Sequence, residues 1–167
     1  MKPDEVTQSF CGTPEYLAPE VINEVGHSFP VDWWTLGILV YEMLIGFPPF
    51  YVGSSNSNAS TMKMYNLIKE KDPVFPDAAK HGIVISDDCK DFIMKCLEKD
   101  PKKRIASKEG VSEVLQHPWF KDLETGKMFN KMYKAEFKPQ LSRDQMDISN
   151  FDKMFTREEA VVSVIPQ

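Results

Sequence analysis

The feature that most constrains the fold is an apolar stretch at residues 31–46, which reads VDWWTLGILVYEMLIG. Ten of the 13 residues at 33–45 are apolar or aromatic, and they would surround a helix completely. A helix that is apolar all round is buried, whereas a membrane span needs about 20 such residues. Asp32 suits an N-terminal cap or an acidic residue of the first turn, and Gly46 suits a left-handed C-terminal cap. The stretch therefore predicts a central helix with other elements packed on all sides.

Composition restricts the class of protein and its partners. The 167 residues are about one domain's worth, and 42% hydrophobic with 27% charged residues is ordinary for a globular protein. A net charge of −5 without a basic run argues against nucleic acid as the main partner. The three cysteines form no Cys-x-x-Cys pair and suit free thiols in a reducing compartment. We therefore expect a cytoplasmic protein with no membrane span.

Shorter helices are predicted on either side of the central one. A segment at residues 17–23 carries Pro19 in its first turn, and a second short helix follows a low-complexity, flexible insertion at residues 53–60. Another helix is expected at residues 107–116. No strand signal is strong before residues 160–165, so the predicted class is mainly α.

The clearest of these helices begins at Ser86. Its apolar residues recur at i, i+3, i+4, i+7 and i+8, which is the pattern of an amphipathic helix; they are Cys89, Phe92, Ile93, Cys96 and Leu97. Acidic residues in its first turn and lysines near its end match the helix dipole. The two cysteines are interpreted as core residues.

Residues 125–167 lose this regular periodicity. Their aromatic residues are spaced like the anchors of an extended tail that lies on a folded body, namely Phe129, Tyr133, Phe137, Phe151 and Phe155.

Several motifs, in order along the chain, resemble a serine/threonine protein kinase. Residues 9–20, SFCGTPEYLAPE, resemble the end of the activation segment, including its Ala-Pro-Glu triplet. Residues 31–50 resemble the family's central helix, and residues 100–104 and 117–120 resemble its closing helices. The tail motifs at residues 137–156 narrow the resemblance to the AGC group, which holds the cyclic-nucleotide-dependent kinases and protein kinase B.

The resemblance implies the lower half of the large (C-terminal) lobe of a protein-kinase fold, mainly α, followed by an extended tail. A partial kinase domain would occupy residues 1–120, from the activation segment to the last helix of the lobe, and the AGC-kinase C-terminal tail residues 121–167. On this interpretation the chain begins inside the activation segment, and the N-terminal part of the kinase is a missing partner. The full-length protein would use ATP and Mg²⁺ to phosphorylate protein substrates near basic residues.

Three catalytic motifs of the family do not occur in these 167 residues. No Gly-x-Gly-x-x-Gly phosphate loop is present, no histidine is followed by Arg-Asp, and Asp91-Phe92 is followed by Ile93 in place of glycine. Phosphoryl transfer needs the phosphate cradle, the base and the metal ligands together. We therefore expect this chain to bind neither ATP nor Mg²⁺ alone, and to be inactive by itself.

The resemblance assigns five residues to substrate binding. Phe10, Pro14 and Leu17 match the apolar pocket for the residue just after the phosphoacceptor, with local packing as the alternative. Glu42 matches the carboxylate that receives a substrate arginine two residues before the acceptor, and Glu15 is a second acidic residue of that surface. The alternatives are an intramolecular partner for Glu42 and a plain surface charge for Glu15.

The activation segment also carries a candidate phosphorylation site. Ser9 matches the family's phosphosite, which an upstream activating kinase would modify; Thr7 is the nearest competitor, and a plain loop serine is the alternative. Thr13 matches the threonine that bonds the catalytic Asp and Lys. Asp32 matches the aspartate that holds the catalytic-loop backbone, so both residues lack their partners in this chain.

The remaining assignments concern the fold and the tail. Glu20 and Arg104 match the ion pair that fixes the activation segment to the lobe, and we expect that pair to be partly or fully buried. Phe151 matches a tail aromatic that reaches the adenine pocket close to ATP, with a pure tail anchor as the alternative. Ser163 lies near the turn-motif phosphosite, although no Ser-Pro or Thr-Pro occurs there.

Two other functions compete with a piece of an active kinase. A non-catalytic substrate-docking or scaffold module would use the same surface without chemistry. A degenerate product without function is disfavoured by the presence of Glu20, Asp32 and Arg104. A catalytic loop and Asp-Phe-Gly directly upstream would favour the enzyme.

Overall fold

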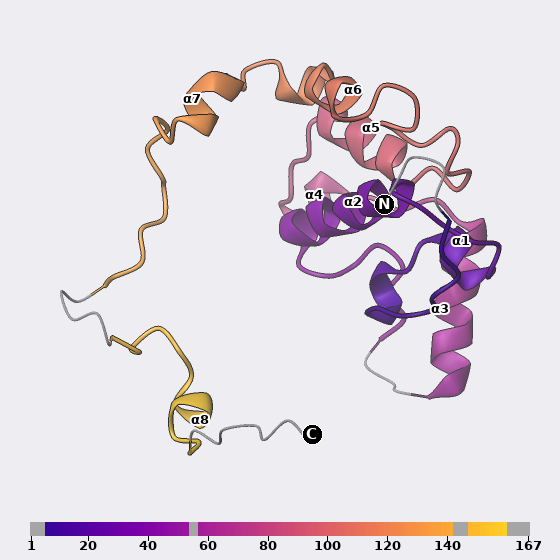
Figure 1. Cartoon of the computed structure of the whole chain (residues 1–167), viewed down its shortest axis with the longest axis horizontal. Helices are drawn as coiled ribbons and strands as arrows, with labels where there is room; N and C mark the ends of the chain where they lie inside the picture. Colours follow the sequence, from indigo (N-terminus) through magenta and orange to yellow (C-terminus); the bar gives the residue numbers. More distant parts are fainter. Residues whose placement is uncertain (1–5, 54–56, 142–146, 160–167) are drawn as a thin grey trace, which may run out of the picture. The chain divides into compact units, whose positions relative to one another are not determined.

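The computed structural model describes residues 6–53, 57–141 and 147–159. The chain forms two compact units, Met1–Leu123 and Glu124–Gln167, and each is considered by itself. The first unit contains, in order, η1 (Pro14–Tyr16), α1 (Pro19–Ile22), α2 (Pro30–Ile45), α3 (Asn58–Glu70), α4 (Ala78–His81), α5 (Asp87–Cys96), α6 (Val111–Leu115) and η2 (Pro118–Phe120) (Figure 1). The second contains α7 (Thr125–Phe129) and α8 (Lys153–Thr156). Within the described ranges the structure is helical, and an isolated antiparallel bridge joins Thr7 to His27.

The predicted central helix is α2: its C-terminal end at Gly46 is confirmed, whereas its N-terminal end lies at Pro30, before the Asp32 position that the sequence indicates, with Phe29 as the N-cap. Pro30 occupies the first turn, where a missing N–H costs nothing, and Asp32 adds a negative charge at the positive end of the helix. Gly46 ends the helix in the left-handed region, at φ 95°, and its N–H donates to the Glu42 carbonyl over 2.7 Å.

Helix α5 packs directly on α2, and the predicted amphipathic pattern is confirmed. The Ser86 hydroxyl accepts from the Cys89 N–H at the start of α5, and Cys89 and Cys96 are buried as predicted. The two helices approach closely at Gly37, where an added Cβ would lie 2.6 Å from the Cβ of Cys96. Only glycine lets the backbones meet at this distance.

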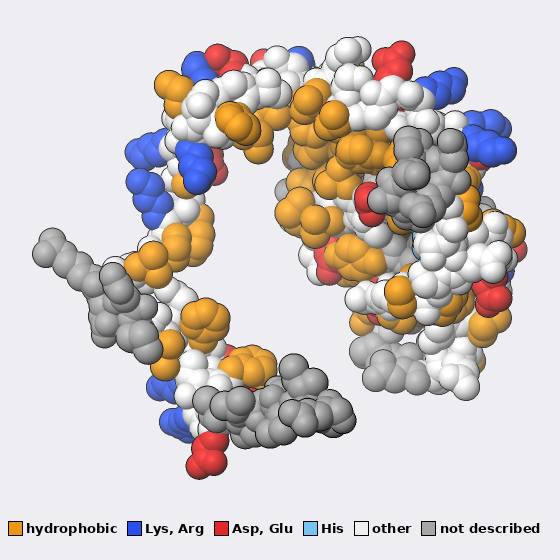
Figure 2. Space-filling view, in the orientation of Figure 1, with side chains coloured by type: hydrophobic (Ala, Val, Ile, Leu, Met, Phe, Trp, Pro, Cys, Tyr) orange, Lys and Arg blue, Asp and Glu red, His pale blue; other side chains and the backbone are white. Residues whose placement is uncertain are grey.

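Among the described residues α2 is not enclosed on all sides, and a chain that lacks the catalytic-loop part of the kinase is expected to expose part of this apolar helix. One face, including Trp34, Ile38 and Tyr41, is buried, but Leu39, Met43 and Leu44 are exposed. Figure 2 shows hydrophobic side chains gathered on the surface of the first unit around α2 and α4. The reason is geometric, because the elements described here pack against one side of the helix and leave the opposite apolar side in contact with solvent.

The helix predicted at residues 107–116 is shorter than expected. Only Val111–Leu115 forms α6, and the preceding residues form turns. Ala106 and Gly110 both have φ 64°, a left-handed backbone that cannot continue a right-handed helix. Periodicity did not reveal these two positions.

The region after α2 also differs from prediction. Helix α3 starts at Asn58, so the last residues of the predicted flexible insertion are helical, because the Ser57 hydroxyl accepts from the Ser60 N–H and caps the helix. Residues 54–56 and the possible strand at 160–165 lie outside the described residues. Helix α4, which sequence periodicity did not predict, is held by the Asp77 side chain at its start and Gly82 at its end.

None of the described helices combines the length and apolarity that crossing a bilayer requires. In the second unit, the aromatics of the predicted tail are exposed, as in the case of Phe137 and Phe151. Their anchoring to a folded body stays a prediction.

Candidate functional site

The predicted ion pair between Glu20 and Arg104 is present and buried. The Arg104 guanidinium donates to both carboxylate oxygens of Glu20, over 2.7 and 2.8 Å. It also donates to the carbonyls of Pro30 and Glu98. Glu20 is 4% exposed and Arg104 is 0% exposed, so this two-bond pairing compensates both charges inside the core. It joins α1, the start of α2 and the turn after α5.

Trp34 lies beneath this pair at the centre of the unit. Two cations lie over its ring: the Arg104 guanidinium carbon is 5.2 Å from the ring centroid, and the Lys99 ammonium nitrogen is 5.0 Å from the centroid. Lys99 also donates to the carbonyls of Ile68 and Lys71 at the end of α3. Burial lowers the pKa of Lys99 to about 8, opposed by the nearby Asp72 and Glu98 carboxylates. Sequence reasoning missed Lys99 because its partners are backbone carbonyls about 30 residues away, which no local pattern encodes.

The segment that carries Ser9 runs beside the loop that leads to α2. Thr7 and His27 exchange two backbone hydrogen bonds of 2.9 Å each. The Thr7 hydroxyl accepts from the Ser9 N–H, and its oxygen lies 3.3 Å from the Ser9 hydroxyl oxygen. The candidate phosphosite Ser9 is exposed, whereas its competitor Thr7 is half-buried.

Glu42, on the side of α2, has an intramolecular partner. The Tyr16 hydroxyl donates to Glu42 Oε2, so the alternative weighed for this carboxylate is the arrangement observed. This hydrogen bond, followed by burial and by the negative charges of Glu42 and Glu15, raises the pKa of Tyr16 to about 12. Two carboxylates thus lie near one phenol, although Glu15 and Glu42 are 27 positions apart in the sequence. Tyr16 is the member of this cluster that the sequence analysis did not single out.

The three residues assigned to an apolar pocket differ in exposure. Phe10 is 50% exposed and Pro14 is also exposed, whereas Leu17 is buried in the core. Pro14 and Leu17 are tied by a backbone hydrogen bond that closes η1. Phe10 and Pro14 therefore present apolar surface to solvent, whereas Leu17 belongs to the core.

Thr13 and Asp32 are both exposed. The Thr13 carbonyl accepts from the Tyr16 N–H, but its side chain makes no capping bond to η1. Asp32 lies in the first turn of α2, and its carbonyl accepts from the Thr35 hydroxyl. Their side chains are accessible to groups from other segments. In the second unit Phe151 is exposed, and Ser163 lies outside the described residues.

The described residues do not suit a metal ion. No group of three or more His, Cys, Asp or Glu side chains among them is arranged to hold one.

Comparison with known families identifies both parts of the chain. The family described as "Protein kinase domain" matches residues 1–120. The family described as "Protein kinase C terminal domain" matches residues 143–167.

Individual kinases match over nearly the whole chain. The chain is 42% identical to the serine/threonine-protein kinase YPK1 of Saccharomyces cerevisiae over 167 residues, which is 100% of this chain and 22% of that protein. It is 43% identical to protein kinase 2 of Dictyostelium discoideum over 95% of this chain and 30% of that protein. It is 34% identical to the protein kinase C epsilon type of Oryctolagus cuniculus over 96% of this chain and 20% of that protein.

The chain therefore spans between 20% and 30% of the length of these three relatives. The predicted resemblance and the mainly helical, partial kinase fold with its C-terminal tail are confirmed. This chain belongs to the protein kinase family and, within it, to the AGC group of serine/threonine kinases.

Proposed function

We propose that the protein to which this chain belongs transfers the γ-phosphoryl group of ATP to Ser or Thr hydroxyls of protein substrates near basic residues. Within it, residues 1–120 form the substrate-facing part of the large lobe, and residues 121–167 form the tail. Family membership supports the reaction class, because kinases of this group use ATP with Mg²⁺.

The observation that carries the substrate class is the acidic cluster around Tyr16. Glu42 accepts a single hydrogen bond from a neutral phenol, which does not neutralise its charge. Glu15 adds a second negative charge that the same phenol senses. Two carboxylates at a partly exposed position suit an arginine side chain, because guanidinium donors pair with carboxylate oxygens over short distances. Glu42 is thus proposed to receive the substrate arginine while Tyr16 holds it in place.

The exposed apolar pair Phe10 and Pro14 supports a preference for an apolar substrate residue just after the phosphoacceptor. Both lie on the same segment as Glu15, and exposed apolar side chains commonly mark a surface that a partner covers. We assign them, together with the core residue Leu17, to the substrate residue that follows the acceptor. The preferred substrate then has arginine shortly before the acceptor and an apolar residue after it.

Ser9 is proposed as the site where an upstream kinase activates the enzyme. It is exposed, and a phosphate there would add up to two negative charges. Thr13 and Asp32, both accessible, are proposed to hold a catalytic loop supplied by the N-terminal part of the kinase. Phe151 is proposed to lie near ATP, and Ser163 to be a second phosphosite. The free thiols Cys11, Cys89 and Cys96 agree with a cytoplasmic location.

The 167 residues alone are proposed to be inactive. They contain neither the phosphate loop nor the catalytic base nor the Asp-Phe-Gly motif, so the barrier to transfer stays near its uncatalysed height. The non-catalytic docking module remains the second candidate, favoured by the fact that the substrate-facing residues are accessible without those motifs.

The test is a peptide array phosphorylated by a form of the protein that includes the sequence upstream. Glu42→Gln should weaken the preference for arginine by about 1.5–3 kcal/mol, the scale of a charged hydrogen bond. Glu70→Gln, which changes an exposed carboxylate on α3, is the matched control and should leave the preference intact. Unchanged arginine selectivity in Glu42→Gln contradicts the assignment, and turnover by the 167-residue chain alone contradicts its proposed inactivity.

A further inference from the structure

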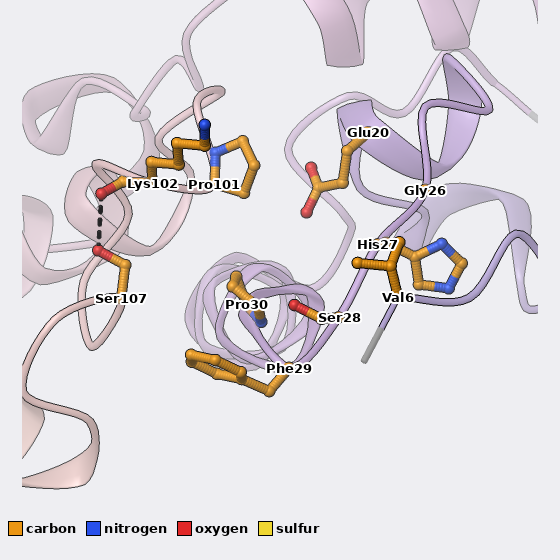
Figure 3. A pocket seen from close by; sticks show the side chains of 10 residues that line it. All are labelled: Val6, Glu20, Gly26, His27, Ser28, Phe29, Pro30, Pro101, Lys102 and Ser107. Atoms are coloured by element: carbon orange, nitrogen blue, oxygen red, sulfur yellow. Dashed lines mark hydrogen bonds between the residues drawn. The ribbon is translucent and has the colours of Figure 1, made fainter. Parts of the chain in front are cut away.

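A cavity of about 270 Å³ opens beside the buried ion pair, away from the acidic cluster. Its walls come from four separated stretches: Val6, Glu20 on α1, the loop Gly26 to Pro30, and the turn that carries Pro101, Lys102 and Ser107. Figure 3 shows the Glu20 carboxylate pointing into the space between Pro101 on one side and Val6 and His27 on the other. The cavity is smaller than the roughly 300–1,000 Å³ typical of drug-sized ligands. It therefore suits an occupant smaller than a drug-sized ligand, such as a single side chain.

The walls suit an apolar occupant. Val6, Phe29, Pro30 and Pro101 supply hydrocarbon surface, and Val6 and Phe29 are exposed to solvent. Water in contact with such surface is displaced favourably by an apolar group. The carboxylate at the base adds no net charge, because both oxygens of Glu20 are bonded to Arg104.

The positive charge of Lys102 at the rim of the cavity indicates which residues should flank the docked side chain. Lys102 lines the cavity with an exposed side chain, and it forms no ion pair with a carboxylate of the described residues. The Ser107 hydroxyl donates to the Lys102 carbonyl over 2.8 Å. The base is neutral and the rim has an uncompensated cation, so negative charge on an incoming segment is favoured locally. This holds despite the overall charge of −5, because distant surface charges are screened beyond about 10 Å.

Occupancy of the cavity is linked to the segment that carries Ser9. Val6 and His27 line the cavity, and the backbone of Thr7, next to Val6, is hydrogen-bonded to His27 in both directions. A side chain seated against the wall that Val6 and His27 form, opposite Pro101, would contact residues from both sides of this bridge. Binding and closure of the bridge then stabilise one another, because coupling between sites is reciprocal.

We propose that this cavity is a docking site for one aromatic or large aliphatic side chain, flanked by acidic residues, on a partner protein. Docking there holds the segment at residues 6–9 against the loop before α2. The site is separate from the proposed substrate surface and does not depend on catalysis.

The probe is a labelled pentapeptide, Asp-Glu-Phe-Asp-Glu, titrated into the chain and followed by amide chemical shifts and fluorescence anisotropy. Shifts are expected at Val6, Gly26 and Ser107. Replacing the peptide's phenylalanine by alanine should weaken binding at least roughly 10-fold, the effect of leaving one such side chain unburied. Replacing its acidic residues by lysine should weaken it as well. Equal binding by either altered peptide, or shifts away from these residues, overturns the proposal.

Substitutions in the protein, as opposed to the peptide, test the same site. Lys102→Glu reverses the rim charge and should weaken the peptide by about 5-fold, and Val6→Ser should remove one wall with a similar loss. Lys63→Glu, an exposed lysine on α3, is the matched control and should bind as the parent does. Peptide at ten times its Kd should slow amide exchange of Thr7 and His27 by about 10-fold. Exchange that does not respond to bound peptide contradicts the linkage.

Discussion

Glu20 and Glu42 are glutamates of one small unit, yet their environments are opposite. Glu20 is buried and bonded through both oxygens to Arg104, which itself has two further carbonyl acceptors. Glu42 is partly exposed, and its partner is the neutral hydroxyl of Tyr16. A carboxylate compensated inside the core can only hold segments together. A carboxylate whose hydrogen-bond donor is a neutral hydroxyl at a half-buried position has no counter-charge in that contact. This difference in burial and in the partner's charge is why Glu20 has a structural role and Glu42 is the residue proposed for recognition.

The largest effect should come from breaking the buried pair. Arg104→Met leaves Glu20 without a counter-charge in the core, and we expect the free energy of unfolding to fall by about 3–5 kcal/mol. Urea unfolding measures this loss. The double variant Glu20→Leu/Arg104→Met should lose less, because no charge is stranded, and Glu42→Gln should change unfolding by less than about 0.5 kcal/mol. Equal stability losses in Arg104→Met and Glu42→Gln would abolish the distinction drawn here.

The second largest effect tests how Tyr16 contributes to the proposed role of Glu42. Tyr16→Phe removes the hydroxyl that holds Glu42 but keeps the ring. In a form of the protein that phosphorylates peptides, preference for arginine should fall by about 1 kcal/mol, less than in Glu42→Gln, because the charge stays and only its orientation is lost. Tyr65→Phe on α3 is a control. A preference that rises in Tyr16→Phe would show that the phenol competes with the substrate for Glu42.

A smaller effect concerns Lys99, which lies over the same Trp34 ring as Arg104 of the buried ion pair. The pKa of Lys99 is lowered by burial to about 8 from the ordinary 10.5. Between these values the unfolded chain binds more protons than the folded one, so the free energy of unfolding should rise as pH increases from about 8 to 10.5. We expect a rise on the order of 1 kcal/mol after allowance for the exposed part of the side chain. Urea unfolding at successive pH values measures this dependence. In Lys99→Met the free energy of unfolding should no longer rise between about pH 8 and 10.5. If it still rises in the variant, another titrating group causes the rise.

The smallest effect is spectroscopic. The hydrogen bond to Glu42 raises the pKa of Tyr16 to about 12, so this bond contributes stability that is present below pH 10 and is lost as pH rises through about 12. Ultraviolet titration of tyrosinate should show Tyr16 ionising late in the parent chain, together with Tyr41, whose pKa is also raised by burial. In Glu42→Gln the Tyr16 step should move nearer pH 10, while the Tyr41 step should stay in place. An unchanged titration curve would mean that Glu42 does not interact with the phenol in solution.

Sequence patterns predicted those features of the fold that depend on residues close together in the chain. The C-terminal end of α2, the amphipathic α5 and the buried cysteines follow from capping residues and helical spacing. The Glu20–Arg104 pairing spans 84 positions and was found only through resemblance to a family. Lys99 has only backbone carbonyls as hydrogen-bond acceptors, which leave no trace in residue type. The positive φ at Gly110 starts α6 four residues later than periodicity predicts, because helical spacing alone does not report the backbone conformation of a glycine.

The close approach of α2 and α5 at Gly37 has a chemical consequence. It covers Cys96, which is 0% exposed, and burial raises the pKa of that thiol to about 12. Cys11, by contrast, lies exposed on the activation segment. A thiol reagent added to the native chain therefore labels Cys11 at once, and it reaches Cys89 and Cys96 only when the core around α5 opens. In a Cys89→Ala variant, the slow labelling rate of Cys96 reports separation of α2 and α5 without any added probe.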